Sequence, residues 1–275
     1  MKDMLKDQVA LVTGAANGMG EATAKLYAQE GAIVIIGDYN VEKAQKVVEE
    51  IKAAGGQARC YGQMDVTKKD QIKAIIDATI AEFGKIDILA AFAGKTFDGS
   101  GLASEVQYQL TMDVNMTGMY HTVFEVVAHM KERKSGKIII CSSNGAFNPT
   151  TPAYEYHMAK AACESLTINL AMEVAPLGIR VNCLKPGPIV TPFWDELLPP
   201  GPERDGLLGG IAQVEVPMAR TGTAADIAGP ALFFASELSS YVTGLCLYVG
   251  GGMGYIYSHG QSFILSAMKK EAACK

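Results

Sequence analysis

The sequence predicts a single doubly wound α/β domain, with a parallel sheet of about seven strands covered by helices on both faces. Short apolar runs alternate with longer amphipathic stretches along most of the 275 residues. A glycine-rich turn at residues 14–20 follows the first apolar run and opens a helix. No linker or internal repeat divides the chain, and this length suits one large domain. We expect this Rossmann-type domain to cover residues 1–254, with 255–275 as a C-terminal extension.

Composition narrows the function classes. The formal net charge is -5, with 19% charged and 49% apolar residues. The sequence has no basic patch of the kind that binds nucleic acid. No apolar run approaches the roughly 18 residues of a membrane span, and the charged N-terminus lacks a signal core. Six cysteines without CxxC spacing favour reduced thiols and a cytoplasmic protein. His121 and His129 have no further ligand at metal-binding spacing, so we expect no metal site.

The first half of the chain predicts four strands and three helices. The strands are expected at 8–13, 32–37, 58–65 and 85–91, and the helices at 21–30, 40–54 and 67–83. Thr67 is the expected cap of the third helix. Right-handed crossovers bring the carboxyl ends of these strands, and the motifs that follow them, to one edge of the sheet.

The second half predicts a long helix at 103–131, a strand at 137–142, a helix at 156–174 and a strand at 179–184. A helix at 224–235 and a strand at 245–249 complete the sheet. Asn115 and Gly118 are poor helix formers, so we expect a local bulge or kink there.

The glycine-rich turn has the residues that a dinucleotide site needs. Gly14 permits a tight turn, Gly18 lets the backbone approach a pyrophosphate, and Gly20 permits close packing of helix and strand. Asn17 and Met19 lie between them, and the helix N-terminus favours an anion. The spacing is GxxxGxG instead of GxGxxG, and a turn that serves packing alone is the alternative.

Asp38 ends the second strand and indicates which of the two nicotinamide cofactors, NAD or NADP, is bound. A carboxylate there binds the adenosine ribose hydroxyls and repels a 2′-phosphate. No Lys or Arg occupies 15–19 or 37–41, so we expect NAD in preference to NADP. The alternative is a turn aspartate, with Asn40 as the helix cap. Asp65 and Val66 follow the third strand, either beside adenine or as a turn.

Tyr156 and Lys160 are four residues apart, on one face of a helix. An ammonium beside a phenol favours the phenolate and lowers its pKa, which suits a general acid or base. Tyr154 is worse placed relative to Lys160. Ser142 and Ser143 point to opposite faces of a strand, and we expect Ser143 to reach the substrate oxygen. A surface Tyr with a solvated Lys is the alternative.

Further site residues follow other strands. Ala93 and Gly94 follow the fourth strand, and Pro186, Gly187, Ile189 and Thr191 follow the sixth, where backbone groups can dock a carboxamide. Segment 192–217 joins a bulky apolar cluster to Pro and Gly residues. We interpret it as a mobile substrate lid with an apolar inner face or, with equal weight, as an oligomer contact. The expected substrate contacts are Ser143, Asn144, Phe193 and Trp194. An inward Asn115 can hold a water beside Lys160, or it bonds its own backbone.

Together these residues resemble the short-chain dehydrogenase/reductase family over about residues 5–254. The resemblance is carried by Thr13-Gly14-xxx-Gly18-x-Gly20, Asp65, Asn115, Ser143, Tyr156-xxx-Lys160 and Pro186-Gly187, with the family's usual interval between Ser143 and Tyr156. It implies a catalytic tetrad of Asn115, Ser143, Tyr156 and Lys160. Tyr156 would exchange a proton with the substrate oxygen, and Lys160 would hold the nicotinamide ribose. Hydride would pass between the substrate carbon and the nicotinamide.

One motif departs from the family pattern. Residues 91–94 read Ala-Phe-Ala-Gly where the family usually has Asn-Asn-Ala-Gly, so Phe92 is expected to fill space near the adenosine or to pack on a helix. The family also implies a dimer or tetramer through helices 103–131 and 156–174. The apolar lid favours a bulky secondary alcohol or ketone, such as a hydroxysteroid or bile acid. A non-catalytic NAD-binding protein, an epimerase and an enoyl reductase remain as alternatives.

Overall fold

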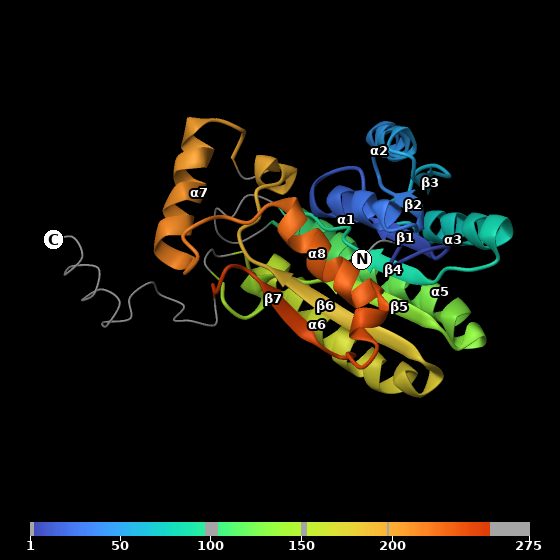
Figure 1. The fold of residues 1–275 in the computed structure, drawn as a ribbon. Helices are drawn as coiled ribbons and strands as arrows, with labels where there is room; N and C mark the ends of the chain where they lie inside the picture. Colours follow the sequence, from blue (N-terminus) through green and yellow to red (C-terminus); the bar gives the residue numbers. More distant parts are fainter. Residues whose placement is uncertain (1–2, 97–103, 150–152, 197, 254–275) are drawn as a thin grey trace, which may run out of the picture.

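The computed structural model describes residues 3–96, 104–149, 153–196 and 198–253, and these form one three-layer α/β/α domain (Figure 1). The described residues contain a seven-stranded sheet in the order β3-β2-β1-β4-β5-β6-β7, and every strand pair is parallel. The predicted fold class is therefore confirmed. The C-terminal extension at 255–275 lies outside the described residues.

The strands are β1 (Val9–Thr13), β2 (Ile33–Gly37), β3 (Gln57–Arg59), β4 (Ile88–Ala91), β5 (Gly136–Cys141), β6 (Ile179–Pro186) and β7 (Cys246–Val249). The α-helices are α1 (Gly18–Gln29), α2 (Val41–Ala53), α3 (Lys69–Phe83), α4 (Glu105–Met112), α5 (Gly118–Arg133), α6 (Tyr154–Val174), α7 (Pro202–Glu215) and α8 (Ala224–Ala235). A π-helical turn, Asp113–Thr117, joins α4 to α5, and short 3₁₀ turns include η2 (Asn144–Ala146), η4 (Pro192–Glu196) and η5 (Glu237–Ser239).

Successive side chains of each strand point to opposite faces of the sheet, and each face has its own hydrophobic core. In β1, Ala10 and Val12 face α1, α2 and α8, whereas Val9 and Leu11 face α3, α5 and α6. Because both faces are covered, each strand is an almost continuous apolar run. The sequence order reverses between β1 and β4, so the carboxyl ends of these two strands border a crevice where α/β sheets bind ligands.

Three local expectations need correction. The third strand, expected at 58–65, pairs only as Gln57–Arg59, because the chain turns at Gly62 with a φ of +130°. Thr67 does not cap α3. Lys68 is the N-cap residue, and the Thr67 hydroxyl donates to the carboxylate of Asp65 instead. The long helix expected at 103–131 is two helices, and the bulge expected at Asn115 is the π-helical turn between them.

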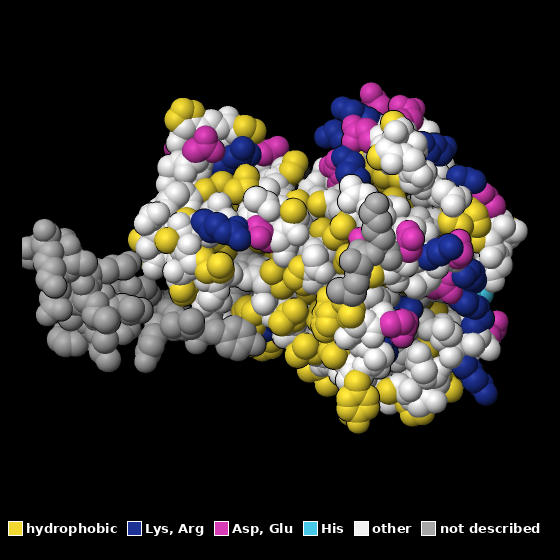
Figure 2. All heavy atoms as spheres, viewed as in Figure 1, with side chains coloured by type: hydrophobic (Ala, Val, Ile, Leu, Met, Phe, Trp, Pro, Cys, Tyr) yellow, Lys and Arg dark blue, Asp and Glu magenta, His cyan; other side chains and the backbone are white. Residues whose placement is uncertain are grey.

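Helix α7 was not predicted. Residues 202–215 contain one proline and three glycines, which the sequence pattern assigns to a loop. The proline occupies the first turn, where its missing N–H costs no hydrogen bond, and burial of Leu208 and Ala212 stabilises the remaining turns. In the space-filling view α7 forms a lobe, and a notch separates this lobe from the part of the domain that carries α1 and α2 (Figure 2).

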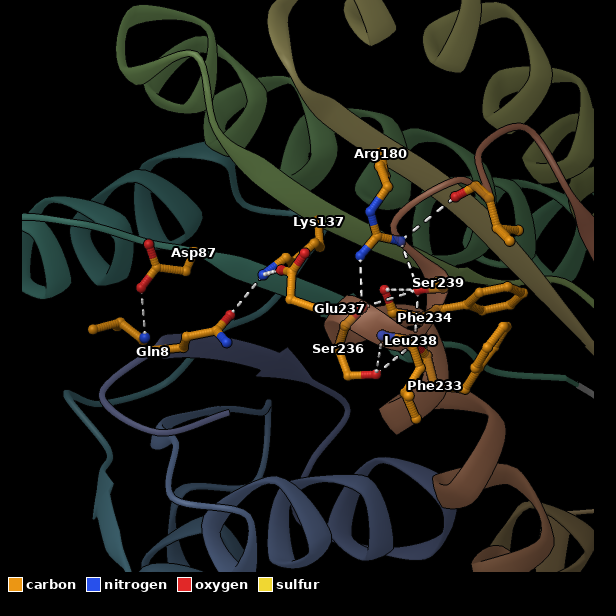
Figure 3. A network of polar contacts seen from close by, with 12 residues as sticks. Gln8, Asp87, Lys137, Arg180, Phe233, Phe234, Ser236, Glu237, Leu238 and Ser239 are labelled. Carbon is orange, nitrogen blue, oxygen red and sulfur yellow. Dashed lines mark hydrogen bonds and ion pairs between the residues drawn. The ribbon is translucent and has the colours of Figure 1, made fainter. Parts of the chain in front are cut away.

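Polar side chains join the amino ends of the strands, at the edge opposite the crevice (Figure 3). Lys137 at the start of β5 donates to Gln8 over 2.9 Å and forms an ion pair with Glu237. The Arg180 guanidinium donates to the Ser239 hydroxyl and to the Ser236 carbonyl, and so binds the C-terminal end of α8 to β6. These contacts stabilise the amino edge of the sheet.

Candidate active site

A cavity of about 430 Å³ opens at the carboxyl ends of β4, β5 and β6. One side is polar and the other is apolar. The predicted site residues that line it are Met19, Gly94, Ser143, Asn144, Tyr156, Lys160, Pro186, Gly187, Ile189, Thr191, Phe193 and Trp194. The sequence analysis missed further lining residues, among them Thr96, Asn148, His157, Leu207, Ile211 and Met253. Residues from seven separate segments of the chain therefore converge on one cavity.

The glycine-rich turn lies at the β1 end of this region. Gly14 and Gly18 have positive φ values of +64° and +57°, which other residues rarely adopt. A Cβ atom on Gly14 would lie 2.8 Å from the backbone nitrogen of Ala93, and one on Gly20 would lie 2.1 Å from the carbonyl oxygen of Gly14. Asn17 precedes α1, and its side chain caps no backbone N–H among the described residues. The amides of the first turn thus remain available to an anion.

Asp38 lies at the end of β2 and contacts this turn. Its carboxylate accepts hydrogen bonds from the backbone N–H groups of Ala16 and Asn40, over 2.9 and 2.8 Å. The Asn40 side chain caps α2 by accepting from Lys43, as the sequence suggested. Asp38 therefore stabilises a turn, and the same negative charge lies beside the glycine-rich backbone. The geometry is compatible with both interpretations of Asp38, as a ribose-binding carboxylate and as a turn aspartate.

Asp65 and Val66 do not line the cavity. Asp65 accepts from the backbone N–H and the hydroxyl of Thr67, so its carboxylate organises the turn before α3. Val66 is buried and packs against Gly118, where a Cβ atom would lie 2.8 Å from the Val66 side chain. These contacts agree with the turn interpretation. The contact with adenine stays a prediction, because Gly14, Gly18 and Asp38 also lie outside the lining of this cavity.

Ser143 and Tyr156 meet at the polar wall. Strand β5 delivers Ser143, which lines the same cavity as Tyr156 and favours the ionised form of its phenol. The Ser143 hydroxyl accepts from the Gly145 N–H over 3.1 Å. Ser142 points the opposite way and is buried against α6, as alternation predicts. Tyr154 is 54% exposed and does not line the cavity, whereas Tyr156 does. The structure thus brings the expected serine and tyrosine together.

Lys160 lies behind Tyr156, almost fully buried. Its Nζ is 5.6 Å from the centre of the Tyr156 ring and donates to the carbonyl oxygen of Cys141 over 3.0 Å. Desolvation raises the pKa of the Tyr156 phenol, while Lys160 and Ser143 act to lower it. The expectation of a net lowered pKa is therefore not met in the protein alone. Burial opposes the charge of Lys160, but the fields of Tyr156 and neighbouring thiols leave its pKa raised.

Asn115 is fully buried in the π-helical turn, and its side chain points at the fourth strand's end. Its Nδ2 donates to the carbonyl oxygens of Thr111 and Lys95, and its Oδ1 accepts from the Lys95 N–H. A Cβ atom on Gly94 would lie 3.0 Å from Asn115 Oδ1 and 3.1 Å from Lys160 Nζ. The π turn thus positions the amide beside the ammonium, and one of its bonds is to its own helix.

The turn at 91–94 keeps its shape without the two amides. The Phe92 N–H donates to the Thr13 carbonyl oxygen, and the Ala93 N–H donates to the Thr13 hydroxyl, each over 3.2 Å. The Phe92 ring is 7% exposed and packs in the core that α1, α2 and α8 cover, at the border of the cavity. Thr13 therefore supplies side-chain bonding to this turn, and Phe92 supplies packing.

The apolar wall follows β6. Backbone contact is close at Gly187, where a Cβ atom would lie 2.7 Å from Gly250 Cα. The Trp194 indole donates to the Ile189 carbonyl oxygen over 2.8 Å, and the Phe193 ring lies 5.7 Å from the Tyr156 ring. Leu207 and Ile211 of α7 complete this wall. They are four residues apart on one helix, a signal that could be used only once α7 was known.

His157 and Asn144 add polar groups to the opposite wall. The imidazole packs on Gly145, whose Cβ position would lie 2.6 Å from His157 Nε2, and burial lowers the pKa of this histidine. Asn144 is 4% exposed, and its Oδ1 has no hydrogen-bond partner within the described ranges. An unpartnered buried acceptor beside a cavity is available to a bound molecule.

These residues fit a nicotinamide dinucleotide. Gly14 and Gly18 are partly exposed, the Asn17 side chain does not cap α1, and the cavity extends from Met19 to the β6 loop. Lys160 presents a cation behind Tyr156, and the β6 loop presents backbone groups. In the described part of the chain no group of His, Cys, Asp and Glu has the arrangement of a metal site, and no helix is long and apolar enough to cross a bilayer.

Comparisons with known proteins agree with this geometry. A family model described as enoyl-(acyl carrier protein) reductase matches residues 14–254. A 3-oxoacyl-[acyl-carrier-protein] reductase of Thermotoga maritima is 35% identical, over 90% of this chain and 98% of its own length. A 3beta-hydroxysteroid dehydrogenase of Eggerthella lenta is also 35% identical, over 92% of this chain and 96% of its own length.

A solved structure shows the same fold. The 3-oxoacyl-[acyl-carrier protein] reductase of Brucella melitensis with bound NAD superposes with a TM-score of 0.81. The two are 32% identical, and the match covers 92% of this chain and 93% of that one. Fold, cavity residues and relatives all agree, and the chain belongs to the short-chain dehydrogenase/reductase family of oxidoreductases, which use a nicotinamide cofactor.

Proposed function

We propose that this protein transfers a hydride between NAD(H) and a secondary alcohol or ketone. The observation that carries the proposal is the convergence of Ser143 and Tyr156 on the cavity, with the buried ammonium of Lys160 behind them. A phenol that can lose and regain a proton beside a hydroxyl donor is the pair of groups that this reaction requires.

The chain's own residues handle the substrate oxygen. Ser143 orients it by hydrogen bonding, and Tyr156 takes its proton during oxidation or returns it during reduction. Lys160 favours the phenolate through its charge and anchors the site through its bond to the Cys141 carbonyl. Asn115 fixes the backbone of Lys95 at the edge of the site. A bound nicotinamide would supply the hydride chemistry.

Two observations support NAD in preference to NADP. Asp38 places a carboxylate beside the glycine-rich backbone through its bond to Ala16. The residues around it, 15–19 and 37–41, include no Lys or Arg that could receive a 2′-phosphate. The Brucella relative with bound NAD is compatible with this choice.

The apolar wall supports a bulky hydrophobic substrate. Phe193, Trp194, Leu207 and Ile211 give this cavity of about 430 Å³ an apolar wall, which favours an apolar substrate. One relative, from Eggerthella lenta, is named as a 3beta-hydroxysteroid dehydrogenase, which agrees with an apolar substrate. We therefore propose a hydroxysteroid-like alcohol, with segment 192–217 as the cover of the site.

A substrate panel tests this proposal. NADH formation is followed with hydroxysteroids, bile acids, polar polyols and 3-hydroxyacyl thioesters, with Tyr156→Phe as the inactive control. Turnover of sterols by the native protein, abolished by Tyr156→Phe, is the expected result. Turnover of polyols or thioesters alone overturns the substrate class. Cofactor binding without turnover of any alcohol favours the non-catalytic alternative.

The exposed faces of α4, α5 and α6 support a homo-oligomer. Among the described residues, nine large apolar side chains on these helices and the π turn are between 36% and 72% exposed, namely Val106, Tyr108, Leu110, Met116, Tyr120, Tyr154, Met158, Ile168 and Met172. Exposed apolar side chains in such number favour an interface. We propose a dimer or tetramer that buries this face.

A further inference from the structure

A buried ion pair lies directly behind the active site. The Lys185 ammonium on β6 is 2.8 Å from the carboxylate of Glu164 on α6, and the two side chains are only 6% and 7% exposed. Glu164 is one helical turn beyond Lys160, and Lys185 immediately precedes the Pro186–Gly187 loop. Both charges are therefore adjacent to groups that face the cavity, although neither charge itself lines it.

Ser142 connects this pair to the catalytic strand. Its hydroxyl lies 3.0 Å from Glu164 Oε1 and 2.9 Å from the backbone carbonyl oxygen of Lys160. A hydroxyl has one proton, so these two acceptors share it. The buried carboxylate thus holds Ser142 against α6 at the level of Lys160.

The neighbours of Ser142 on both sides are site groups. The carbonyl oxygen of the preceding residue, Cys141, accepts a hydrogen bond from the Lys160 ammonium. The following residue, Ser143, lines the cavity together with Tyr156. Fixing Ser142 against α6 therefore fixes two other distances at once, from Lys160 to the strand and from Ser143 to Tyr156.

Lys185 also contacts two aromatic rings near the cavity. Its Nζ lies 4.2 Å from the centre of the Tyr248 ring and 5.0 Å from that of Phe147. The Tyr248 hydroxyl accepts from Asn148 over 2.6 Å, and Asn148 lines the cavity. The same ammonium thus ties the loop after Ser143 to the edge strand β7, next to the Pro186–Gly187 loop.

Stability alone does not explain such a pair. Desolvation of two charges offsets most of their attraction, and well-packed apolar side chains usually serve a core at least as well. We propose that Glu164 and Lys185 are positioning residues, which hold Ser143 and Lys160 in the geometry that Tyr156 requires. This inference rests on the proposed dehydrogenase function.

Four variants separate positioning from stability. Lys185→Met leaves Glu164 buried without its partner. Glu164→Gln keeps one side-chain oxygen, which can still accept from Ser142, but removes the charge that pairs with Lys185. The double variant Glu164→Leu/Lys185→Met removes both charges and the acceptor. Arg133→Met is the matched control, because it breaks the partly buried pair with Asp87 at the opposite edge of the sheet, where side chains are 28% and 13% exposed.

Steady-state kinetics on the native protein's best alcohol give the first readout. For Lys185→Met and for the double variant we expect kcat to fall ~10–100-fold with KM nearly unchanged, because misplaced groups slow chemistry more than binding. The double variant regains thermal stability that Lys185→Met loses, yet it does not regain kcat. Glu164→Gln retains most of kcat, and Arg133→Met loses stability without loss of kcat.

A second readout needs no substrate. The ionisation of Tyr156 is measured by ultraviolet difference titration against the same protein carrying Tyr156→Phe. In Lys185→Met and in the double variant, the apparent pKa of Tyr156 is expected to rise by roughly one unit, because Lys160 is no longer held at its distance. In Arg133→Met it is expected to stay at the native value.

Two outcomes overturn the inference. One is a double variant with native stability, native kcat and a native Tyr156 titration, which would make the pair a replaceable part of the core. The other is an equal loss of kcat in Arg133→Met. If the native protein oxidises no alcohol, the proposed function fails, and the Tyr156 titration still decides the role of the pair.

Discussion

The Lys160 ammonium donates to the carbonyl oxygen of Cys141 over 3.0 Å, so a cation on helix α6 is bonded to the end of strand β5. The strand then delivers Ser143 and the helix carries Tyr156. One hydrogen bond thus links the two elements that supply the catalytic groups, and it stabilises a buried charge that would otherwise be costly.

The pH dependence of alcohol oxidation tests the roles of Tyr156 and Lys160. Oxidation needs the phenolate as base, so the rate rises as pH rises through the Tyr156 pKa. Lys160→Met removes the charge that favours the phenolate, so this limb moves to higher pH and the neutral-pH rate falls. Tyr156→Phe lowers kcat ~10²–10⁴-fold at every pH. Unchanged pH profiles in Lys160→Met would refute its electrostatic role.

Gly14→Ala tests the cofactor turn. The new Cβ would lie 2.8 Å from the Ala93 backbone nitrogen at a φ of +64°, so we expect loss of NADH binding and a lower melting temperature. Gly229→Ala in α8 is the control, because nothing lies within 4 Å of its Cβ position. Because Pro230 follows Gly229 and disfavours a side chain there in the helical conformation, the gain in helix propensity is offset. The variant should leave NADH binding and the melting temperature nearly unchanged. Fluorescence titration and thermal unfolding measure both.

Asp87 is expected to make the free energy of unfolding decrease as the pH falls. Burial disfavours its charge, but bonds from the Val9 N–H and from Arg133 and Lys85 leave its pKa lowered. A lowered folded-state pKa contributes stability above the unfolded value, about 4, and this is lost as pH falls through the folded pKa. Asp87→Asn should therefore cost about 1–3 kcal/mol at neutral pH and flatten the acid dependence.

An exposed pair provides the control for that measurement. The Lys73–Asp77 side chains are 60% and 58% exposed, so Asp77→Asn should change unfolding in urea very little. Equal effects of the two substitutions would contradict the assignment of acid sensitivity to Asp87.

The proposed homo-oligomer can be tested by the mass of the protein in solution. Light scattering should show a dimer or tetramer, and Ile168→Glu combined with Met172→Glu should shift it toward the monomer, because charges would be buried at the proposed interface. Val41→Glu on α2, across the sheet, is the control and should leave the mass unchanged. A monomeric native protein would rule out this interface.

Periodic and motif-bearing segments could be predicted from the sequence, and packing-dependent ones could not. The buried strands and the bulge at Asn115 follow from local pattern and propensity. Helix α7 did not, because burial of Leu208 and Ala212 overrides its glycines. Thr67 has the residue type of a cap, but Asp65 competes for its hydroxyl. The ion pair of Glu164 and Lys185 joins residues 21 apart in sequence, which no spacing rule connects.

Cofactor preference tests the central claim most directly. The native protein and Asp38→Ala are titrated with NADH and with NADPH, and nicotinamide fluorescence is recorded. We predict that the native protein binds NADH at least ~10-fold more tightly and that Asp38→Ala gains NADPH binding, because the repelling carboxylate is gone. Tighter binding of NADPH by the native protein, or binding of neither nucleotide, would contradict the account.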